Sequence, residues 1–315
     1  MSANKIKIGL LGIGRMGQNH LRNIMLLKDA ELVFIYDVDK DACAKLSAQY
    51  GVKVSEDLDA DMKTVDGVVI VTPTFTHFDY IKRAAACVKN IFVEKPLTDS
   101  AETAKEVVRL AEEKGLNIQV GFIERYNPAV ATLKAVMQNS ESVICAEFNR
   151  SNKVASGRIT DVDVVIDLMI HDIDLALGLN GNAARVTAHG HRKNGIIEYA
   201  RALATHENGR VSDITSSRIT EKRIRQINVA CEDMFIDCNL LNKEVKVHRP
   251  AGQDMPGAVL TAKDEAVEVK LYDALQAELS DFVKLCRGEK TQASDVYAGL
   301  ASLEIAEEIR KQIKG

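Results

Sequence analysis

Several features that would place the chain in a class at once are missing from the sequence. It has no unbroken run of about 18 apolar residues, the length that a membrane-spanning helix needs, so we expect no membrane segment. Its six cysteines show no CxxC spacing, which argues against a zinc site and against a small disulfide framework. Reduced thiols and a cytoplasmic location fit this pattern. The first apolar run leads straight into a glycine loop, unlike a signal peptide.

A strong charge of one sign is also missing. The 41 lysines and arginines nearly balance the 45 aspartates and glutamates, and the formal net charge is -4. A nucleic-acid-binding face normally shows a basic cluster, so we expect no nucleic-acid partner. The sequence shows no internal repeat or low-complexity segment. With 315 residues, 46% of them hydrophobic, the chain is long enough for two domains of ordinary size.

The first 122 residues alternate short apolar segments with amphipathic ones, which predicts a parallel sheet with helices on both faces. We expect six strands in a Rossmann-like, doubly wound domain with right-handed crossovers. The predicted strands are KIKIGLL, ELVFIYD, GVKV, DGVVIVT, KNIFVEK and NIQVGF.

The pattern changes after about residue 122. Two helical segments, at 127–138 and 164–179, are followed by strands joined through short polar turns such as HENGR, which is typical of antiparallel pairing. Two more helical segments end the chain. The fold class is therefore α/β, with a Rossmann domain at 1–122 and an α+β domain with a large, mainly antiparallel open sheet at 123–315.

The segment KIGLLGIGRMGQNHL carries Gly12, Gly14 and Gly17 in GxGxxG spacing. The motif alone is weak, but here it follows a predicted strand and opens a predicted helix, the context that a dinucleotide site requires. Gly12 permits a tight turn, Gly14 lets a pyrophosphate approach the backbone, and Gly17 allows close packing of the helix. Backbone N–H groups and the helix dipole then hold the anion.

Asp37 ends the second predicted strand, where an acid accepts hydrogen bonds from the adenosine ribose. A carboxylate there repels a 2′-phosphate, and no arginine follows at once, so the sequence favours NAD over NADP. The alternative is that Asp37 only caps a loop, because aspartate is frequent in turns.

The segment DVVIDLMIHDIDLALG, residues 163–178, places charged side chains inside an apolar run, where they are rare unless paired or used. Asp167 and His171 lie one turn apart on a helix and share a face. Asp174 lies near that face and could support the imidazole of His171. Asp172 points away and is interpreted as a solvated or structural acid.

The segment FVEKPL at 92–97 places Glu94, Lys95 and Pro96 at the end of the fifth predicted strand. With the glycine loop and an antiparallel second domain, it resembles the glucose-fructose oxidoreductase, inositol dehydrogenase and rhizopine-catabolism (Gfo/Idh/MocA) family of NAD(P)-dependent dehydrogenases, over essentially the whole chain. VTPTFTH at 71–77 is similar to the turn that lines the nicotinamide ribose, with Thr74 in place of the usual asparagine. DVYAGLASLEIAEEI looks like the family's C-terminal helix, and Asp167 with His171 resembles the catalytic pair.

The resemblance implies that 1–122 binds NAD and that 123–315 binds substrate and joins copies into a homodimer or homotetramer through open sheet faces. It implies catalysis by Lys95, Asp167 and His171, and substrate binding by these three with Arg125 and Tyr126. The implied cofactor-binding residues are Gly12, Gly14, Arg15, Met16, Gly17, Asp37, Thr72, Pro73, Thr74, His77, Glu94 and Lys95.

Oxidation of a secondary alcohol needs a base for the hydroxyl proton, a donor for the developing alkoxide and a hydride acceptor held close to the carbon. His171 suits the base, because a free imidazole titrates at about 6.5. Lys95 suits the donor to the substrate oxygen. Lys95 is the alternative base, since burial disfavours a charged lysine. Asp167 could orient the substrate, the imidazole or Lys95.

Each of these residues also has a structural interpretation. Lys95 could be a solvated strand end, with Pro96 holding a turn through a cis bond as in the family. His171 could be a satisfied core histidine, and its pairing with Asp167 could only brace the helix.

Other polar residues also allow either a functional or a structural interpretation. Arg125 could bind a substrate phosphate or brace the domains, and Asn127 could be only an N-cap before Pro128. His189 and His191 share a strand face without a third ligand nearby, so we expect no metal site.

The substrate is indicated by resemblance alone. GFIERYNPAV at 121–130 and VVIDLMIHDID look most like the branch that oxidises the 3-hydroxyl of UDP-N-acetylglucosamine to a 3-keto sugar. Alternatives are an inositol or free-sugar dehydrogenase, or a non-catalytic regulator that binds NAD; the retained Lys95, Asp167 and His171 favour an enzyme. The candidate diphosphate contacts are Arg125, Lys153, Arg158 and Arg192.

Overall fold

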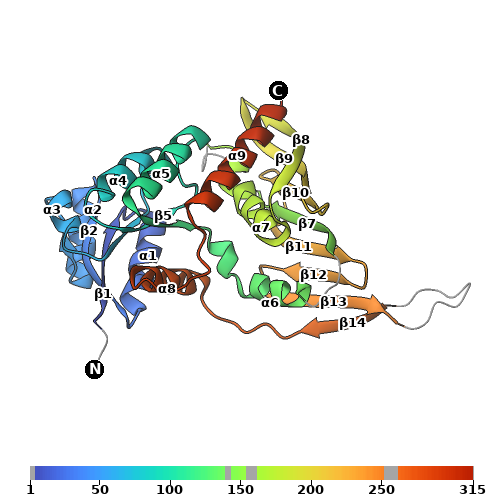
Figure 1. The fold of residues 1–315 in the computed structure, drawn as a ribbon, viewed down its shortest axis with the longest axis horizontal. Coiled ribbons are helices and arrows are strands. Elements are labelled where there is room, and N and C mark those ends of the chain that lie inside the picture. Colours follow the sequence, from blue (N-terminus) through green and yellow to red (C-terminus); the bar gives the residue numbers. More distant parts are fainter. Residues whose placement is uncertain (1–3, 139–142, 154–161, 252–261, 315) are drawn as a thin grey trace, which may run out of the picture. The chain divides into compact units, whose positions relative to one another are not determined.

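The computed structural model describes residues 4–138, 143–153, 162–251 and 262–314. The chain forms two compact units (Figure 1), which are described separately. The first unit comprises Met1–Ile123 and Asp273–Leu303, and the second comprises Glu124–Tyr272 and Glu304–Gly315.

The first unit contains a six-stranded, fully parallel sheet in the order β3-β2-β1-β4-β5-β6, which confirms the predicted Rossmann-type domain. Its strands are β1 (Ile6–Leu11), β2 (Ala30–Tyr36), β3 (Lys53–Val54), β4 (Gly67–Ile70), β5 (Asn90–Glu94) and β6 (Asn117–Gly121). Its helices and turns are α1 (Arg15–Leu26), α2 (Lys40–Tyr50), α3 (Leu58–Met62), the 3₁₀ turn η1 (Thr74–Thr76), α4 (His77–Ala84), α5 (Ala101–Lys114) and α8 (Ala274–Cys286).

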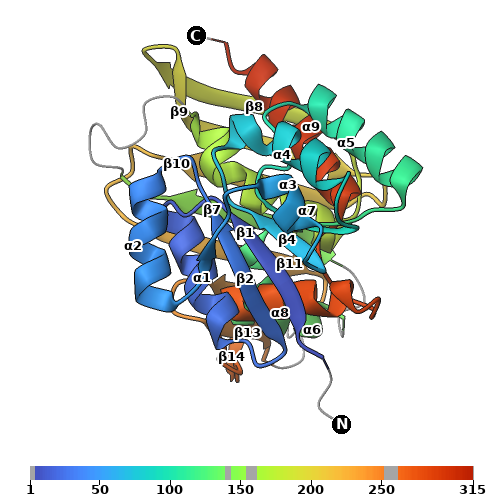
Figure 2. The same ribbon diagram turned by 90° about the vertical axis from the view of Figure 1, so that its left-hand side faces the viewer.

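Helices cover both faces of this sheet. Figure 2 shows α1 and α2 on one side of β1 and β2, and α4 and α5 on the other side of the sheet. The central strands are mostly apolar and buried because both of their faces are covered; β4, for example, is buried at all four positions. The carboxyl ends of β1, β2, β4 and β5 therefore meet at one edge of the sheet, where this fold binds ligands.

Helix α8 belongs to the first unit, whereas the sequence-based division at residue 122 assigned it to the second. The cause is its apolar face. Leu275, Leu279 and Phe282 are buried in the same core as β1 and α1, and the Phe282 ring packs edge-on against Phe92 of β5. The chain thus returns to the first unit before it ends.

The second unit contains an eight-stranded sheet in the order β14-β13-β12-β11-β7-β10-β9-β8, in which only the β7–β10 pair is parallel. This confirms the predicted mainly antiparallel sheet, although β14, with the charged sequence AKDEAV, was not predicted. The strands are β7 (Val143–Ser151), β8 (Ala183–Lys193), β9 (Ile196–His206), β10 (Val211–Ser217), β11 (Ile224–Cys231), β12 (Phe235–Asn239), β13 (Glu244–Pro250) and β14 (Ala262–Val267). The helical segments are α6 (Pro128–Met137), the π-turn η3 (Val165–Met169) and α7 (Ile170–Asn180). The 3₁₀ turn η2 (Ile123–Tyr126) and the helix α9 (Val296–Gln312) each start in the first unit and end in the second.

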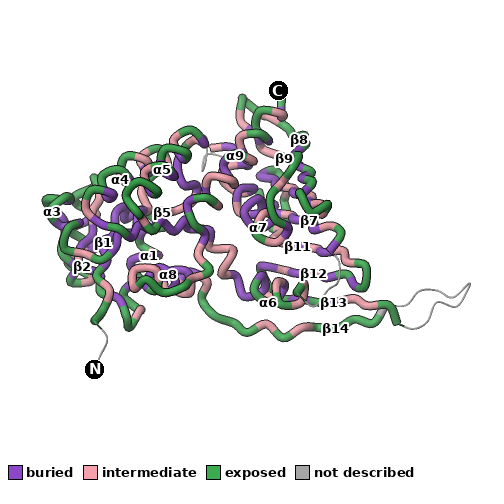
Figure 3. The backbone as a smooth tube through the Cα atoms, in the orientation of Figure 1, coloured by how far each residue is buried: buried purple, intermediate pink, exposed green. Residues whose placement is uncertain are grey.

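Helices cover only one face of this second sheet. Buried residues of α6, η3, α7 and the end of α9 form a single apolar core with the inward side chains of β7 to β13. Buried positions accordingly alternate with half-buried or exposed ones along the strands (Figure 3). No helix among the described residues is long and apolar enough to cross a membrane.

Candidate functional site

The glycine loop after β1 has the geometry that its spacing predicted. Gly12 has a φ of 90°, and a Cβ there would lie 2.5 Å from the carbonyl oxygen of Val71. A Cβ on Gly17 would lie 2.1 Å from the carbonyl oxygen of Gly12. Only glycine fits these two positions, because a backbone neighbour cannot move aside as a flexible side chain can.

Gly14 differs from the other two glycines because its surroundings are open. It stands directly before α1, and a Cβ there would meet nothing within 4 Å. Having no side chain, it leaves the first N–H groups of α1 uncapped, and the first turn holds no acid. Arg15 and Met16 are exposed beside it. This arrangement fits a dinucleotide pyrophosphate at a helix N-terminus.

Asp37 ties the end of β2 to the glycine loop. Its Oδ2 accepts from the backbone N–H of Ile13 at 2.8 Å, and its Oδ1 accepts from that of Asp39 at 3.1 Å. Asp37 therefore does brace the loop, as the structural alternative expected. A carboxylate oxygen has two acceptor positions, so this role is compatible with hydrogen bonds from a ribose.

The segment around Lys95 is anchored by a buried pair at the end of β5. The Nε2 of His20, a fully buried residue of α1, lies 2.7 Å from the Oε1 of Glu94. Burial works against the charge of Glu94, but His20 and Lys95 lower the pKa of its carboxyl overall. Oε2 of Glu94 accepts from the backbone N–H of Lys95, and the Lys95–Pro96 bond is cis. The pair fixes the backbone that carries Lys95.

His77 has a structural place in this part of the site. Its Nδ1 lies 2.9 Å from the carbonyl oxygen of Pro96, and its Nε2 lies 2.9 Å from that of Thr72. The ring is buried, and burial lowers the pKa of His77 in spite of these two carbonyls. His77 thus ties together the turns that follow β4 and β5, and its contact with the cofactor stays a prediction. Thr72, Pro73 and Thr74 remain half-buried or exposed in the first of these turns.

In the second unit, the acids of the segment 163–174 all pair with arginines from other elements. The sequence predicted a solvated or structural role for Asp172 and support of the His171 imidazole for Asp174, and it predicted none of these partners. The pairs are Asp163–Arg310 (2.6 Å), Asp167–Arg218 (3.4 Å), Asp172–Arg150 (2.7 Å) and Asp174–Arg125 (2.6 Å).

Three of the pairs are structural. Asp172 accepts two hydrogen bonds from Arg150, both side chains being almost fully buried, and Arg150 also donates to Glu124 at 2.7 Å. Burial opposes the charge of Arg150, yet the carboxylates raise the pKa of its guanidinium; Arg150 in turn lowers the pKa of Glu124 despite burial. Asp163 caps the helix, because its Oδ1 accepts from the N–H groups of Val165 and Ile166.

Arg125 belongs to this structural set. It donates from two nitrogens, at 2.7 and 2.6 Å, to the carboxylate of Asp174, which is only 1% exposed. A buried carboxylate needs such a partner, so Arg125 braces the second unit. Asn127 is the N-cap of α6, as expected, and accepts from the N–H of Ala129. Tyr126 is half-buried in the turn before it.

Asp167 and His171 are the less buried polar residues of the helix. Asp167 lies in the π-turn η3, which replaces the regular helix that we predicted; such turns are frequent at functional sites. His171 follows in α7 and is half-buried. Lys95 belongs to the first unit and this pair to the second.

The other candidate diphosphate contacts are Arg192, Lys153 and Arg158, and their surroundings differ. Arg192 donates to the backbone carbonyls of Gly195, Arg310 and Ile313, so it holds the end of α9 in place of a ligand. Lys153 is exposed and pairs with Glu221. Arg158 lies outside the described residues.

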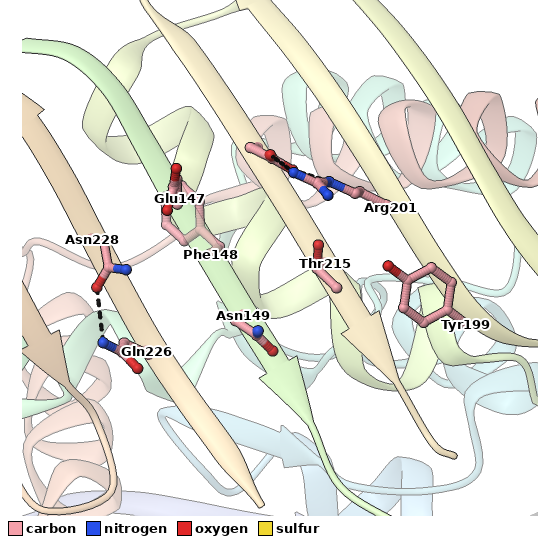
Figure 4. A pocket seen from close by; sticks show the side chains of 9 residues that line it. Glu147, Phe148, Asn149, Tyr199, Arg201, Thr215, Gln226 and Asn228 are labelled. Carbon is pink, nitrogen blue, oxygen red and sulfur yellow. Dashed lines mark hydrogen bonds and ion pairs between the residues drawn. The ribbon is translucent and has the colours of Figure 1, made fainter. Parts of the chain in front are cut away.

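A cavity of about 330 Å³ lies on the helix-free face of the second sheet, away from the core in which α7 packs. Figure 4 shows its polar lining on neighbouring strands, where Gln226 donates to Asn228. Arg201 donates there to Asp213 of β10. No residue predicted for catalysis lines this cavity.

Comparison with known proteins agrees with both units. Residues 6–122 match the model described as oxidoreductase family, NAD-binding Rossmann fold, and residues 146–236 match that of the GFO/IDH/MocA C-terminal domain. The chain belongs to the GFO/IDH/MocA family. This family comprises NAD-dependent oxidoreductases that act as sugar and polyol dehydrogenases.

Two curated relatives of this GFO/IDH/MocA chain match nearly its full length. UDP-N-acetylglucosamine 3-dehydrogenase of Acidithiobacillus ferrooxidans is 29% identical over 315 residues, covering 98% of this chain and 97% of the relative. The scyllo-inositol 2-dehydrogenase (NAD(+)) of Bacillus subtilis is 29% identical over 327 residues, covering 96% and 92%. The solved structure of the Acidithiobacillus enzyme matches with a TM-score of 0.88 at 28% identity, covering 99% of this chain and 98% of that chain.

Proposed function

We propose that the chain is an NAD-dependent dehydrogenase that oxidises the 3-hydroxyl of UDP-N-acetylglucosamine to the 3-keto sugar. The observation that carries the proposal is the match along both units to an enzyme of that name, in sequence and in structure. Inositol oxidation is the second candidate, because the scyllo-inositol dehydrogenase is equally identical over 96% of the chain.

The proposed chemistry divides among three residues. Bound NAD supplies the acceptor for the hydride that leaves the carbinol carbon. His171 takes the hydroxyl proton, and Lys95 donates to the substrate oxygen as negative charge develops there. Asp167 orients the imidazole or the substrate. The Glu94–His20 pair supports this role for Lys95, since Glu94 also accepts from the backbone N–H of Lys95 and so fixes the backbone from which its side chain projects.

We further propose that the cofactor is NAD and not NADP. Asp37 places a carboxylate at the end of β2, and Asp39 adds a second one at the N-cap of α2. Both charges oppose a 2′-phosphate at this edge. Lys40 offsets them only in part, since its ammonium lies over the Tyr36 ring and donates to the Asp37 carbonyl.

Two proposals concern binding and assembly. Of the candidate diphosphate contacts that the structure describes, Lys153 is the exposed one and is the proposed contact. Arg125 pairs with Asp174, and Arg192 donates to backbone carbonyls. The helix-free face of the second sheet is the proposed contact between copies in a homodimer or homotetramer. Light scattering at several concentrations tests the assembly, and a monomer at all of them contradicts it.

The function is tested by following NAD reduction optically with UDP-N-acetylglucosamine, with myo- and scyllo-inositol, and with free N-acetylglucosamine. We expect turnover with the UDP-sugar alone and a 3-keto product by mass spectrometry. Turnover with an inositol but not with the UDP-sugar supports the second candidate. NAD binding without turnover of any alcohol supports a non-catalytic regulator.

A further inference from the structure

Arg218 stands out among the arginines of the second unit because it is buried without a complete set of partners. It follows directly after β10 and is 6% exposed. Its Nη2 lies 3.4 Å from the Oδ2 of Asp167. Its Nε is buried and has no hydrogen-bond partner within the part of the chain that the structure describes. Burying a guanidinium in this state costs free energy, which calls for a compensating role.

The backbone of Arg218 is held firmly on both sides. Its N–H donates to the carbonyl of Glu198 in β9 at 2.8 Å, and the carbonyl of Ser217 accepts from the N–H of Asn152 at 2.9 Å. The hydroxyl of Thr220 donates to that of Ser217 at 2.7 Å and closes the turn. The incomplete contact of the guanidinium is therefore not the result of a loose backbone.

The other arginines that face this helix make closer contacts. Arg125 and Arg150 each bind their aspartate through two nitrogens at 2.6 to 2.8 Å, and their aspartates are at most 3% exposed. Asp167 is 26% exposed, and Arg218 makes one long contact with it. The contrast separates pairs whose carboxylates are closed off in the core from a pair whose carboxylate is partly exposed.

We propose that Arg218 is a positioning residue for the dehydrogenation, whose guanidinium orients the Asp167 carboxylate on the turn before His171. The inference rests on the proposed function, because it assigns Arg218 to the reaction through Asp167. Arg218 itself does not take or give the proton.

A double-mutant cycle tests the inference with R218Q, D167N and the combined variant, using NAD reduction with whichever alcohol the wild-type protein oxidises. We expect R218Q to lower kcat by about 10- to 100-fold, less than the loss of an acid or base itself. The KM for NAD should stay unchanged. In the D167N background, R218Q should lower kcat less than about twofold, since coupled residues do not add. R218K, which keeps the charge, should recover most of the loss.

The split between kcat and KM adds a readout that a purely structural role would not give. R218Q should lower kcat at an unchanged KM for NAD, whereas a general loss of structure would weaken cofactor binding as well. R249Q is the matched control, since Arg249 makes a single 3.2 Å contact with Asp233 at an exposed site, and it should retain full activity.

The outcomes separate two failures. An unchanged kcat in R218Q, or an equal loss in the wild-type and D167N backgrounds, overturns the role of Arg218 and leaves the proposed function standing. A wild-type protein that oxidises no alcohol overturns the proposed function and this inference together. If R218Q does not fold, R218K decides: a kcat within about threefold of the wild type supports the inference, and a loss as large as about 10- to 100-fold overturns it.

Discussion

The two units build their functional residues in different ways. In the first unit, the cofactor site consists of backbone: glycines at fixed intervals, uncapped N–H groups at the start of α1 and one aspartate that ties two loops. In the second unit, the predicted catalytic residues Asp167 and His171 stand on a helical segment whose aspartates pair with arginines from η2, β7, the turn after β10 and α9. The first site is therefore determined by residue spacing along a short segment, and the second by contacts between residues that are distant in the sequence.

The largest effect should come from the residues that the proposal assigns to chemistry in each unit. K95A and H171A should each lower the single-turnover rate of hydride transfer by about 10²- to 10⁴-fold, the usual value of acid–base assistance. H189A, which removes an exposed histidine of β8, is the control. A loss below about tenfold removes the residue concerned from the mechanism.

The dependence of the second unit on pairing is tested by R150M. Removing this arginine leaves Asp172 and Glu124 buried without their counter-charge, so the free energy of unfolding should fall by about 3–5 kcal/mol. R201M removes an arginine of similar pairing from an exposed position and should cost less than about 1 kcal/mol. Denaturant unfolding measures both, and equal losses would contradict the distinction.

The backbone character of the first site is tested by two alanine variants. G17A forces a Cβ against the Gly12 carbonyl and should lower stability by about 1–3 kcal/mol. G14A meets open space, so its unfolding should match that of the wild type while NAD binding weakens by about tenfold. Scanning calorimetry measures the stability of both variants, and titration calorimetry measures their affinity for NAD. An unchanged NAD affinity in G14A would contradict a pyrophosphate bound next to Gly14.

The acid at the end of β2 is expected to set cofactor choice. D37S removes the carboxylate that opposes a 2′-phosphate, and the preference for NAD over NADP should fall by about tenfold, or about 1.4 kcal/mol. The ratio of kcat/KM for the two cofactors measures it. A preference that stays the same in D37S argues against this role.

The smallest effect concerns a pH-dependent contact at the sheet edge. The ring nitrogens of His248 lie 2.8 Å from the carboxylate of Asp264 and 3.0 Å from that of Asp237. The two carboxylates raise the pKa of His248. A raised folded-state pKa means that this contact stabilises the protein fully below about pH 6.5 and that its contribution is lost as the pH rises through the folded value. H248Q should remove a small pH dependence of Tm above pH 6.5; an unchanged slope would show that the contact contributes nothing.

The same comparison explains what could be predicted. Residue spacing indicated the parallel sheet, the roles of Gly12 and Gly17 and the antiparallel second sheet, because those features follow from local backbone geometry. The sequence carried no signal for the Asp–Arg pairs, since Arg150, Arg218 and Arg310 lie far from the helix along the chain. His20 was missed for the same reason, and the spacing could not show that Arg125 pairs with Asp174 or that His77 lies between two backbone carbonyls.

The most direct test is the rate of NAD reduction by the wild-type protein with UDP-N-acetylglucosamine and with scyllo-inositol at equal concentrations. The account predicts turnover with the UDP-sugar, loss of that turnover in H171A, and no reduction with the inositol. Turnover with scyllo-inositol and none with UDP-N-acetylglucosamine would contradict it.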